Sequence, residues 1–180
     1  MEIKSIDMEG ILIIQPSVFG DQRGHFFESF RRDSMKNHGV SEDFVQDNQS
    51  LSSKGILRGL HFQKDPYSQG KLVRVIKGAV LDVAVDIRKS SPSYGKHFAI
   101  ELNEDNKTMM YIPRGFAHGF LTLEDQTIFS YKCTNYYHKE SEGAVLWNSK
   151  DLDIKWGIDN PVLSEKDKAS IDFEEFMSPF

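Results

Sequence analysis

Short segments of alternating apolar and polar residues, separated by glycine, proline, asparagine or aspartate, run through most of this chain. Residues 79–87 show the pattern best: every odd-numbered position is apolar, and the even-numbered positions include Asp82 and Asp86. Successive side chains of a β-strand point to opposite faces, so this segment is predicted to be a strand. Many such strands joined by frequent turns predict a mainly β protein, either a sandwich or a barrel.

Further segments with the same pattern are predicted to be strands. They cover residues 10–15, 24–30, 44–49, 57–63, 71–77, 97–102, 108–112, 117–123 and 127–134. A turn is predicted at residues 19–21 and a helix at residues 31–39, which ends at a glycine. A second helix is predicted to start at Ser164, with Asp167 three residues on as a capping-box acid. With no repeat and no linker, residues 1–180 are predicted to form one domain.

The polar face of residues 79–87 has two interpretations. Asp82 and Asp86 would face solvent if the strand lay in a half-exposed antiparallel sheet. Alternatively, the charged face lines the inside of a barrel, where polar groups meet a ligand. The alternation alone does not choose between them.

Charge and cysteine content exclude several classes of protein. The formal net charge is −5, from 22 Lys and Arg against 27 Asp and Glu, which argues against a broadly basic nucleic-acid or membrane-surface protein. Cys133 is the single cysteine, so an internal disulfide is impossible and a packed thiol is expected. The N-terminal residues resemble neither a signal peptide nor a membrane span. A cytoplasmic location is the simplest expectation.

Common catalytic templates are absent from the sequence. There is no glycine-rich phosphate loop, no GxSxG elbow and no HExxH. The six histidines stand singly, without the HxH pair that often begins a metal site in small barrels. The sequence therefore predicts a protein without a metal.

One histidine lies within a cationic, strand-like stretch. His61 is followed by Lys71 and Arg74 and preceded by Arg58. Histidine has an ordinary pKa near 6.5, and cations around it can hold an anion formed by proton removal. This grouping predicts an enzyme that removes a proton from carbon.

Several longer motifs occur in a fixed order. They read FGDQRGHFFESF, FVQDNQS, RGLHFQ, QGKLVRVIKGAVLDVAVDIRKSSPSYGK, IPRGFAHGF, YKCTNYY and SEKD. In order and spacing they resemble the dTDP-4-dehydrorhamnose 3,5-epimerase family, from about residue 11 to residue 168. The resemblance implies a mainly β, cupin-type jelly-roll barrel with flanking strands and a few short helices. It also implies a homodimer with exchanged N-terminal strands and a reaction without metal or other cofactor.

The resemblance further implies inversion of C3 and C5 of dTDP-4-dehydro-6-deoxy-D-glucose, giving dTDP-4-dehydro-L-rhamnose. His61 would be the base, and Asp167 would orient its ring. Lys71 would lie near the C4 oxygen, and Tyr131 would return a proton from the opposite face. Each has a plain alternative: Asp167 as a helix cap, Lys71 as a solvated strand lysine, and Tyr131 as a half-buried aromatic residue.

Other family positions point to substrate binding. Arg23, Arg58 and Lys166 would contact the nucleotide or its phosphates, for which the arginine fork is well suited. Further substrate contacts are implied for Glu28, Gln46, Asn48, His118 and Glu142, and stacking on the base for Phe19 and Tyr136. His118 fits a hydrogen-bonded structural histidine equally well. The segment with Arg23 and Glu28 would reach the neighbouring subunit's pocket.

The positions of Arg58 and His61 within residues 57–63 do not fit a regular strand. In a regular strand Arg58 and His61 would point to opposite faces, whereas the resemblance places both in the pocket. Gly59 is therefore predicted to mark a β-bulge. Two other functions stay open: epimerisation at one carbon or ketone isomerisation on a related dTDP-sugar, and sugar binding without catalysis.

Overall fold

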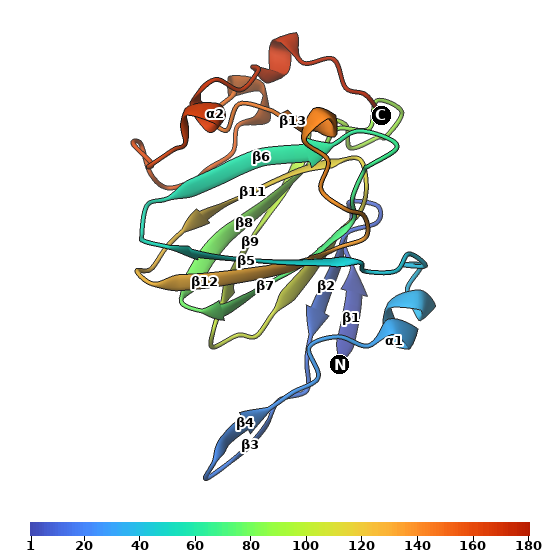
Figure 1. Ribbon diagram of the computed structural model, residues 1–180, viewed down its shortest axis with the longest axis vertical. Helices are drawn as coiled ribbons and strands as arrows, with labels where there is room; N and C mark the ends of the chain where they lie inside the picture. Colours follow the sequence, from blue (N-terminus) through green and yellow to red (C-terminus); the bar gives the residue numbers. More distant parts are fainter.

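Two β-sheets that face each other form most of the computed structural model, which describes residues 1–180 (Figure 1). The six-stranded sheet contains, in spatial order, β1 (Glu2–Ser5), β2 (Leu12–Gln15), β10 (Met109–Ile112), β7 (Lys71–Lys77), β12 (Thr127–Cys133) and β5 (Gln46–Ser52). The five-stranded sheet contains β13 (Glu142–Ala144), β6 (Leu57–Gln63), β11 (Phe116–Thr122), β8 (Ala79–Asp86) and β9 (His97–Asn103). The sheets are not closed into one continuous barrel, because each keeps two edge strands.

Short helical segments and one hairpin complete the fold. The α-helices are α1 (Arg32–Asn37) and α2 (Glu165–Lys168), and 3-10 turns cover Lys139–Ser141, Lys150–Leu152 and Phe173–Glu175. The hairpin pairs β3 (Phe19–Asp21) with β4 (Gly24–Phe26). No helix is both long enough and apolar enough to cross a membrane. The mainly β architecture agrees with the alternation in the sequence.

Most strands lie where the sequence predicts them, and β6 and β7 have the predicted limits. The turn predicted at residues 19–21 is wrong, because these residues form β3 and the chain reverses at Gln22 and Arg23. The Asp21 carboxylate accepts hydrogen bonds from the backbone N–H and the Nε of Arg23. These bonds stabilise the turn at Gln22 and Arg23, just after the predicted position. The sequence analysis also missed β1 and β13, which have four and three residues.

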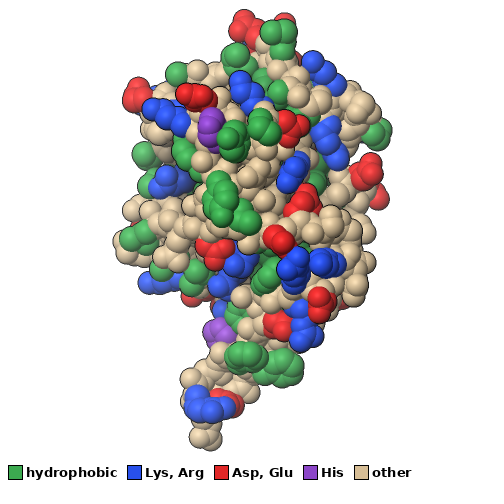
Figure 2. All heavy atoms as spheres, turned by 45° about the vertical axis from the view of Figure 1, so that its right-hand side comes forward, with side chains coloured by type: hydrophobic (Ala, Val, Ile, Leu, Met, Phe, Trp, Pro, Cys, Tyr) green, Lys and Arg blue, Asp and Glu red, His purple; other side chains and the backbone are tan.

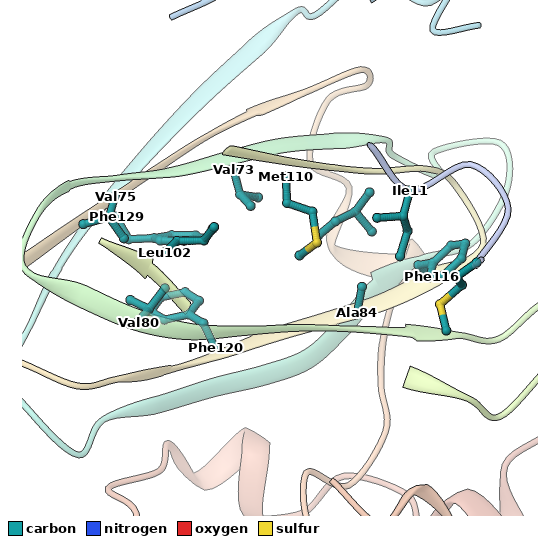
Figure 3. Close-up of a cluster of buried hydrophobic side chains, with 12 residues drawn as sticks. Ile11, Val73, Val75, Val80, Ala84, Leu102, Met110, Phe116, Phe120 and Phe129 are labelled. Carbon is teal, nitrogen blue, oxygen red and sulfur yellow. The ribbon is translucent and has the colours of Figure 1, made fainter. Parts of the chain in front are cut away.

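The space between the sheets is filled by apolar side chains at one end. Figure 3 shows Val73, Val75 and Phe129 from the six-stranded sheet pointing toward Val80 and Phe120 from the five-stranded sheet. All of these side chains are 5% exposed or less. Burial of this apolar surface is the main favourable contribution to folding.

The polar face of β8 points into this interior, which excludes the solvent-face interpretation. Asp82 and Asp86 are both 0% exposed. Burial alone disfavours ionisation of Asp86, but hydrogen bonds from Arg88, Ser91 and Ser93 outweigh it and lower the pKa of the carboxyl to about 2. Asp86 is therefore a structural anion at the end of β8.

Two further apolar clusters cover the outer faces of the sheets. The opposite face of β8, with Val83 and Val85, packs under the C-terminal part of the chain, including Trp156. Figure 1 shows this C-terminal part, in red, beside β6. On the six-stranded sheet, Met35 of α1 packs on Leu72 and its neighbours.

The β3–β4 hairpin projects from the body of the molecule (Figure 1). Its aromatic side chains Phe19 and Phe26 are 67% and 71% exposed. Figure 2 shows the hairpin as a narrow extension at the bottom of the view, with charged side chains at its tip. Arg23 at this tip has a side chain that is 90% exposed.

Candidate active site

A cavity of about 390 Å³ opens between β5 and the β6–β13 edge of the other sheet. Ten residues line it: Gln46, Asn48, His61, Phe62, Gln63, Gln69, Lys71, Tyr131, Tyr137 and Glu142. Six of them are site residues predicted from the sequence. A larger surface cavity of about 550 Å³ lies between residues 6–9 and 92–98, but no predicted site residue lines it. The smaller cavity is therefore the candidate active site.

His61 and Asp167 are in direct contact, although 106 positions separate them. His61 Nε2 lies 2.5 Å from Asp167 Oδ1. Asp167 is 3% exposed, and its second carboxylate oxygen accepts a hydrogen bond from Ser164 Oγ at 2.7 Å. Ser164 Oγ also accepts from the Asp167 backbone N–H, so Asp167 is a helix-capping residue and a histidine partner at once.

Asp167 is held in the ionised form. Burial alone disfavours its charge, but hydrogen bonds from His61, Ser164 and the Gly59 backbone outweigh this and lower its pKa. An ionised carboxylate on one ring nitrogen fixes the tautomer of the imidazole and stabilises the imidazolium after proton uptake. The side chain of His61 is 29% exposed, and it lines the cavity.

A β-bulge at Gly59 brings Arg58 and His61 to one face of β6, as the sequence analysis predicted. Arg58 pairs with Phe120 and His61 with His118, so two β6 residues lie opposite Gly119 alone. Gly59 has a φ of +131°, and a Cβ there would lie 2.4 Å from Gly119 Cα and 2.8 Å from the His118 carbonyl oxygen. Only glycine permits this close approach of the two strands.

Replacing Gly59 with alanine is expected to lower the free energy of unfolding by about 2–4 kcal/mol, because the new methyl group meets backbone atoms that cannot move away. Denaturant unfolding measures the loss. Gly24→Ala is the matched control: Gly24 has a φ of +124°, but a Cβ there has no heavy atom within 4 Å. Equal losses in both variants would mean that backbone strain, and not the clash, makes glycine necessary.

Lys71 and Tyr131 face His61 from the six-stranded sheet. Lys71 on β7 pairs with Cys133 on β12, and Tyr131 lies two positions away on the same face of that strand. The pKa of Lys71 is lowered, because the effect of burial outweighs the raising effects of Cys133, Asp82 and Glu142. Burial raises the pKa of Tyr131, so its phenol is protonated at neutral pH. A base, an ammonium group and a phenol donor therefore share one cavity.

Glu142 and its partners lie at the cavity mouth. Its carboxylate accepts a hydrogen bond from Tyr137 Oη at 3.0 Å and forms an ion pair with Lys166. Burial disfavours the charge of Glu142, but these contacts outweigh it and lower the pKa. Tyr137 lines the cavity, whereas Tyr136 is 62% exposed and does not. The sequence analysis missed Tyr137, and only its place in the tyrosine pair of YKCTNYY pointed to it.

Gln46 and Gln63 connect the strands to the loops around the mouth. Gln46 Nε2 donates to Asn48 Oδ1 at 3.2 Å, and Gln46 Oε1 accepts from the Tyr137 backbone N–H at 2.9 Å. Gln63 Nε2 donates to two carbonyl oxygens, those of Tyr67 and Tyr136. The sequence analysis missed Gln63, because its role depends on contacts with loops distant in sequence.

His118 lies behind the cavity wall, opposite His61 across the β6–β11 pair. It is 6% exposed, and its Nε2 lies 3.0 and 3.1 Å from the two carboxylate oxygens of Asp82. This is the hydrogen-bonded structural histidine that the sequence left open. The substrate contact implied for His118 stays a prediction, and Asp82 was not predicted as its partner.

Four other predicted residues do not line the cavity. Phe19 and Arg23 lie on the hairpin, and Glu28 forms an ion pair with Arg31 at 3.3 Å. Arg58 Nε and Nη2 donate to Ser52 Oγ at 3.3 and 3.2 Å, beside the cavity. Their predicted contacts with substrate stay predictions. No group of three or more His, Cys, Asp or Glu residues is arranged to hold a metal ion, and a metal-free reaction likewise stays a prediction.

Comparisons with known proteins agree with the motifs. A family model described as dTDP-4-dehydrorhamnose 3,5-epimerase matches residues 5–175. The dTDP-4-dehydrorhamnose 3,5-epimerase of Shigella flexneri is 50% identical over 168 residues, which cover 93% of each chain. The crystal structure of dTDP-6-deoxy-D-glucose-3,5-epimerase from Legionella pneumophila Philadelphia 1 in complex with dTDP-4-keto-L-rhamnose is 44% identical. Its TM-score is 0.93, with 98% of this chain and 94% of that chain covered.

The chain is also similar to an epimerase that is described as acting at one position. The crystal structure of a 3'-monoepimerase from Streptomyces bikiniensis in complex with dTDP-quinovose is 32% identical. Its TM-score is 0.88, and the match covers 93% of this chain and 85% of that chain. The similarity therefore spans nearly the whole chain and confirms the cupin-type jelly-roll fold. It also includes a protein that is described as a 3'-monoepimerase.

Proposed function

The chain belongs to the dTDP-4-dehydrorhamnose 3,5-epimerase family and is an epimerase of the isomerase class, and from this premise we propose how its residues act. The proposed reaction converts dTDP-4-dehydro-6-deoxy-D-glucose to dTDP-4-dehydro-L-rhamnose by inversion at C3 and C5. One observation carries the proposal: the His61–Asp167 pair lies on one side of the cavity, and Lys71 and Tyr131 line it from the opposite sheet.

His61 is the proposed base. The C4 ketone makes the hydrogens on C3 and C5 removable, because the charge left on carbon delocalises to the C4 oxygen as an enolate. The neutral imidazole takes the proton, and the Asp167 carboxylate 2.5 Å from Nε2 stabilises the resulting imidazolium. Because Asp167 is held ionised by its other hydrogen bonds, it performs this task without being protonated itself.

Lys71 and Tyr131 complete the proposed proton transfer. The Lys71 ammonium group stabilises the enolate oxygen, an interaction worth about 3–4 kcal/mol when such a preorganised group is removed. The Tyr131 phenol then delivers a proton to the face of the sugar opposite His61. Its raised pKa keeps this proton available at neutral pH. Removal on one face and return on the other inverts the carbon.

The remaining predicted residues are proposed to hold the nucleotide sugar. Arg58 and Lys166 border the cavity and supply positive charge for the diphosphate. Glu142, Gln46 and Asn48 offer hydrogen-bonding groups on the wall, and Tyr137 offers an aromatic surface for the base at the mouth. The substrate contact of His118 and the base contacts of Phe19 and Tyr136 remain part of this proposal.

Proton NMR of the keto sugar in deuterated buffer tests the reaction. The double epimerase predicts loss of the C3 and C5 proton signals together with formation of the inverted sugar. Exchange at one carbon only would favour the single-carbon alternative, which the similarity to the 3'-monoepimerase supports. Binding without exchange at either carbon would contradict catalysis and favour the sugar-binding alternative.

We also propose that the protein is a homodimer in which the β3–β4 hairpin reaches the partner subunit's cavity. The hairpin projects into solvent, its aromatic side chains are exposed, and Arg23 lies at its tip (Figure 1). Exposed apolar side chains on a protruding element are typical of an interaction site. Arg23 and Glu28 would then complete a site that one chain leaves open, with the N-terminal strands exchanged between the subunits.

Mixing two inactive variants is expected to restore activity if Arg23 acts on the partner's cavity. In a heterodimer of His61→Ala and Arg23→Ala subunits, one of the two cavities has both residues intact. Random pairing would therefore restore about a quarter of the wild-type rate. His61→Ala mixed with Lys71→Ala is the control, because both residues line the cavity of their own chain. Restoration in the control, or none in the first mixture, would contradict the proposal.

We further propose that the protein works in the cytoplasm. Its one cysteine, Cys133, is buried and free. Free cysteines are usual in reducing compartments, where disulfides are rare.

A further inference from the structure

Tyr137 lies on a loop at the cavity mouth, and its ring has a fixed partner although it is far from buried. It is 54% exposed, lines the cavity and donates from Oη to Glu142 Oε2 at 3.0 Å. A loop residue gives up backbone and rotamer freedom when it makes such a bond. The groups that hold the loop therefore decide whether the ring is in place before a ligand arrives.

The peptide group between Tyr136 and Tyr137 is bound from both sheets. Its N–H donates to Gln46 Oε1 on β5 at 2.9 Å, and its carbonyl oxygen accepts from Gln63 Nε2 on β6 at 3.1 Å. β5 belongs to the six-stranded sheet and β6 to the five-stranded sheet. The next N–H along the chain, that of His138, donates to Gln63 Oε1 at 2.6 Å. The backbone on either side of the Tyr137 side chain is thus attached to both walls of the cavity.

The amide group of Gln63 has no hydrogen left for a ligand. Its Nε2 also donates to the Tyr67 carbonyl oxygen at 2.7 Å, and Gln63 is only 6% exposed. Two donors and one acceptor on a single group are what a primary amide supplies, and neither a carboxylate nor a thioether can replace it. The Tyr67 ring stacks on the His138 ring with centroids 3.9 Å apart, so the two loops that Gln63 joins also pack together. Gln63 lines the cavity, but its amide binds the loops at the mouth.

We propose that Gln63 is a positioning residue that fixes the Tyr137 loop between the two sheets and so holds the Tyr137 ring at the cavity mouth, ready to receive the nucleotide base. Gln63 pairs in register with Glu142, so the residue that binds the backbone around Tyr137 and the residue that accepts its phenol lie side by side on β6 and β13. A wall that is fixed in advance reduces the ordering that binding would otherwise require. The part played by the base rests on the proposed function.

Calorimetric titration with dTDP tests this role without turnover. Gln63→Met keeps the length of the side chain and removes all three hydrogen bonds. It is expected to weaken dTDP binding about tenfold, because the ligand must then order the Tyr137 ring and its loop. If Gln63→Met does not fold, Gln63→Glu takes its place, since it loses both donors and keeps the acceptor for the His138 N–H.

Asn106→Leu is the matched control, in the loop between β9 and β10. The Asn106 amide also makes three bonds to loop backbone: it donates to the Glu101 carbonyl oxygen at 3.0 Å and accepts from the N–H groups of Asn103 and Thr108 at 3.3 and 2.9 Å. None of these residues lines the cavity. The control is expected to lose stability and to bind dTDP as the wild type does. Equal weakening in the control and in Gln63→Met would show a merely structural role and would overturn the proposal.

A double-mutant cycle shows whether Gln63 acts through Tyr137. In a Tyr137→Ala background, Gln63→Met is expected to cause no further loss of dTDP affinity, because the ring that it positions is already absent. The same tenfold loss in both backgrounds would mean that Gln63 acts on the ligand by another route, and the proposal would be wrong.

Steady-state kinetics with the keto sugar provides a second readout. Gln63→Met is expected to raise KM about tenfold and to leave kcat within about threefold, as for a residue that affects binding and not proton transfer. A fall in kcat at unchanged KM would contradict this role. Wild-type protein that does not bind dTDP would contradict the proposed function itself, whereas dTDP binding that is equal in the wild type and Gln63→Met would overturn only this inference.

Discussion

Replacing His61 with alanine is expected to slow deuterium incorporation at both C3 and C5 at least about a thousandfold, toward the upper end of the range for general base catalysis. No other group that lines the cavity can replace the imidazole. The Glu142 carboxylate is a weak base because its contacts lower its pKa, and the Tyr131 phenol stays protonated. Lys71 enters the proposed reaction as an ammonium group, which has no lone pair to accept a proton. Proton NMR in deuterated buffer measures both carbons at once.

Two further variants, one far from the cavity and one at the partner of His61, show whether this result is specific to His61. His38→Ala is the control, because His38 is exposed on the far end of α1 and its ring contacts only the Ser34 carbonyl. Asp167→Asn is expected to keep the fold and slow exchange about a hundredfold, since the amide no longer stabilises the imidazolium. Exchange that survives at one carbon in His61→Ala would reveal a second base and would contradict a single-base mechanism.

Local pattern was sufficient to predict much of the scaffold. Residues 57–63 and 71–77 became β6 and β7 with their predicted limits, because their alternation matches the strand period. The bulge at Gly59 was predicted only with the help of the family resemblance, which places Arg58 and His61 on one face and so requires a change of parity. The helix start at Ser164 follows from side-chain capping, which is a local interaction.

The contacts that make the site could not be predicted from local pattern. Asp82 and His118 meet because β8 and β11 pair in one register, and no short-range signal in either segment encodes that register. Which of Tyr136 and Tyr137 lines the cavity likewise depends on how their loop lies against Gln46. The contact of His61 with Asp167 was inferred only from the family resemblance, because 106 positions separate the two residues.

Replacing Tyr131 with phenylalanine is expected to separate proton exchange from inversion. His61 would still remove a proton, exchange it with solvent and return deuterium to the same face. Without the phenol, the opposite face has no positioned donor, so inversion is expected to fall about a hundredfold or more while exchange continues. NMR distinguishes the two outcomes, because exchanged starting sugar keeps its configuration and inverted sugar has different coupling constants.

The control for this separation is Tyr94→Phe, since Tyr94 packs on Phe173 and does not line the cavity. It is expected to leave both rates within about twofold of the wild type, as for most surface substitutions. Equal losses of exchange and inversion in Tyr131→Phe would mean that the phenol acts before or during proton removal, for example by binding the enolate oxygen. Tyr131 would then share the task assigned to Lys71, and the proton donor would have to be sought on another wall of the cavity.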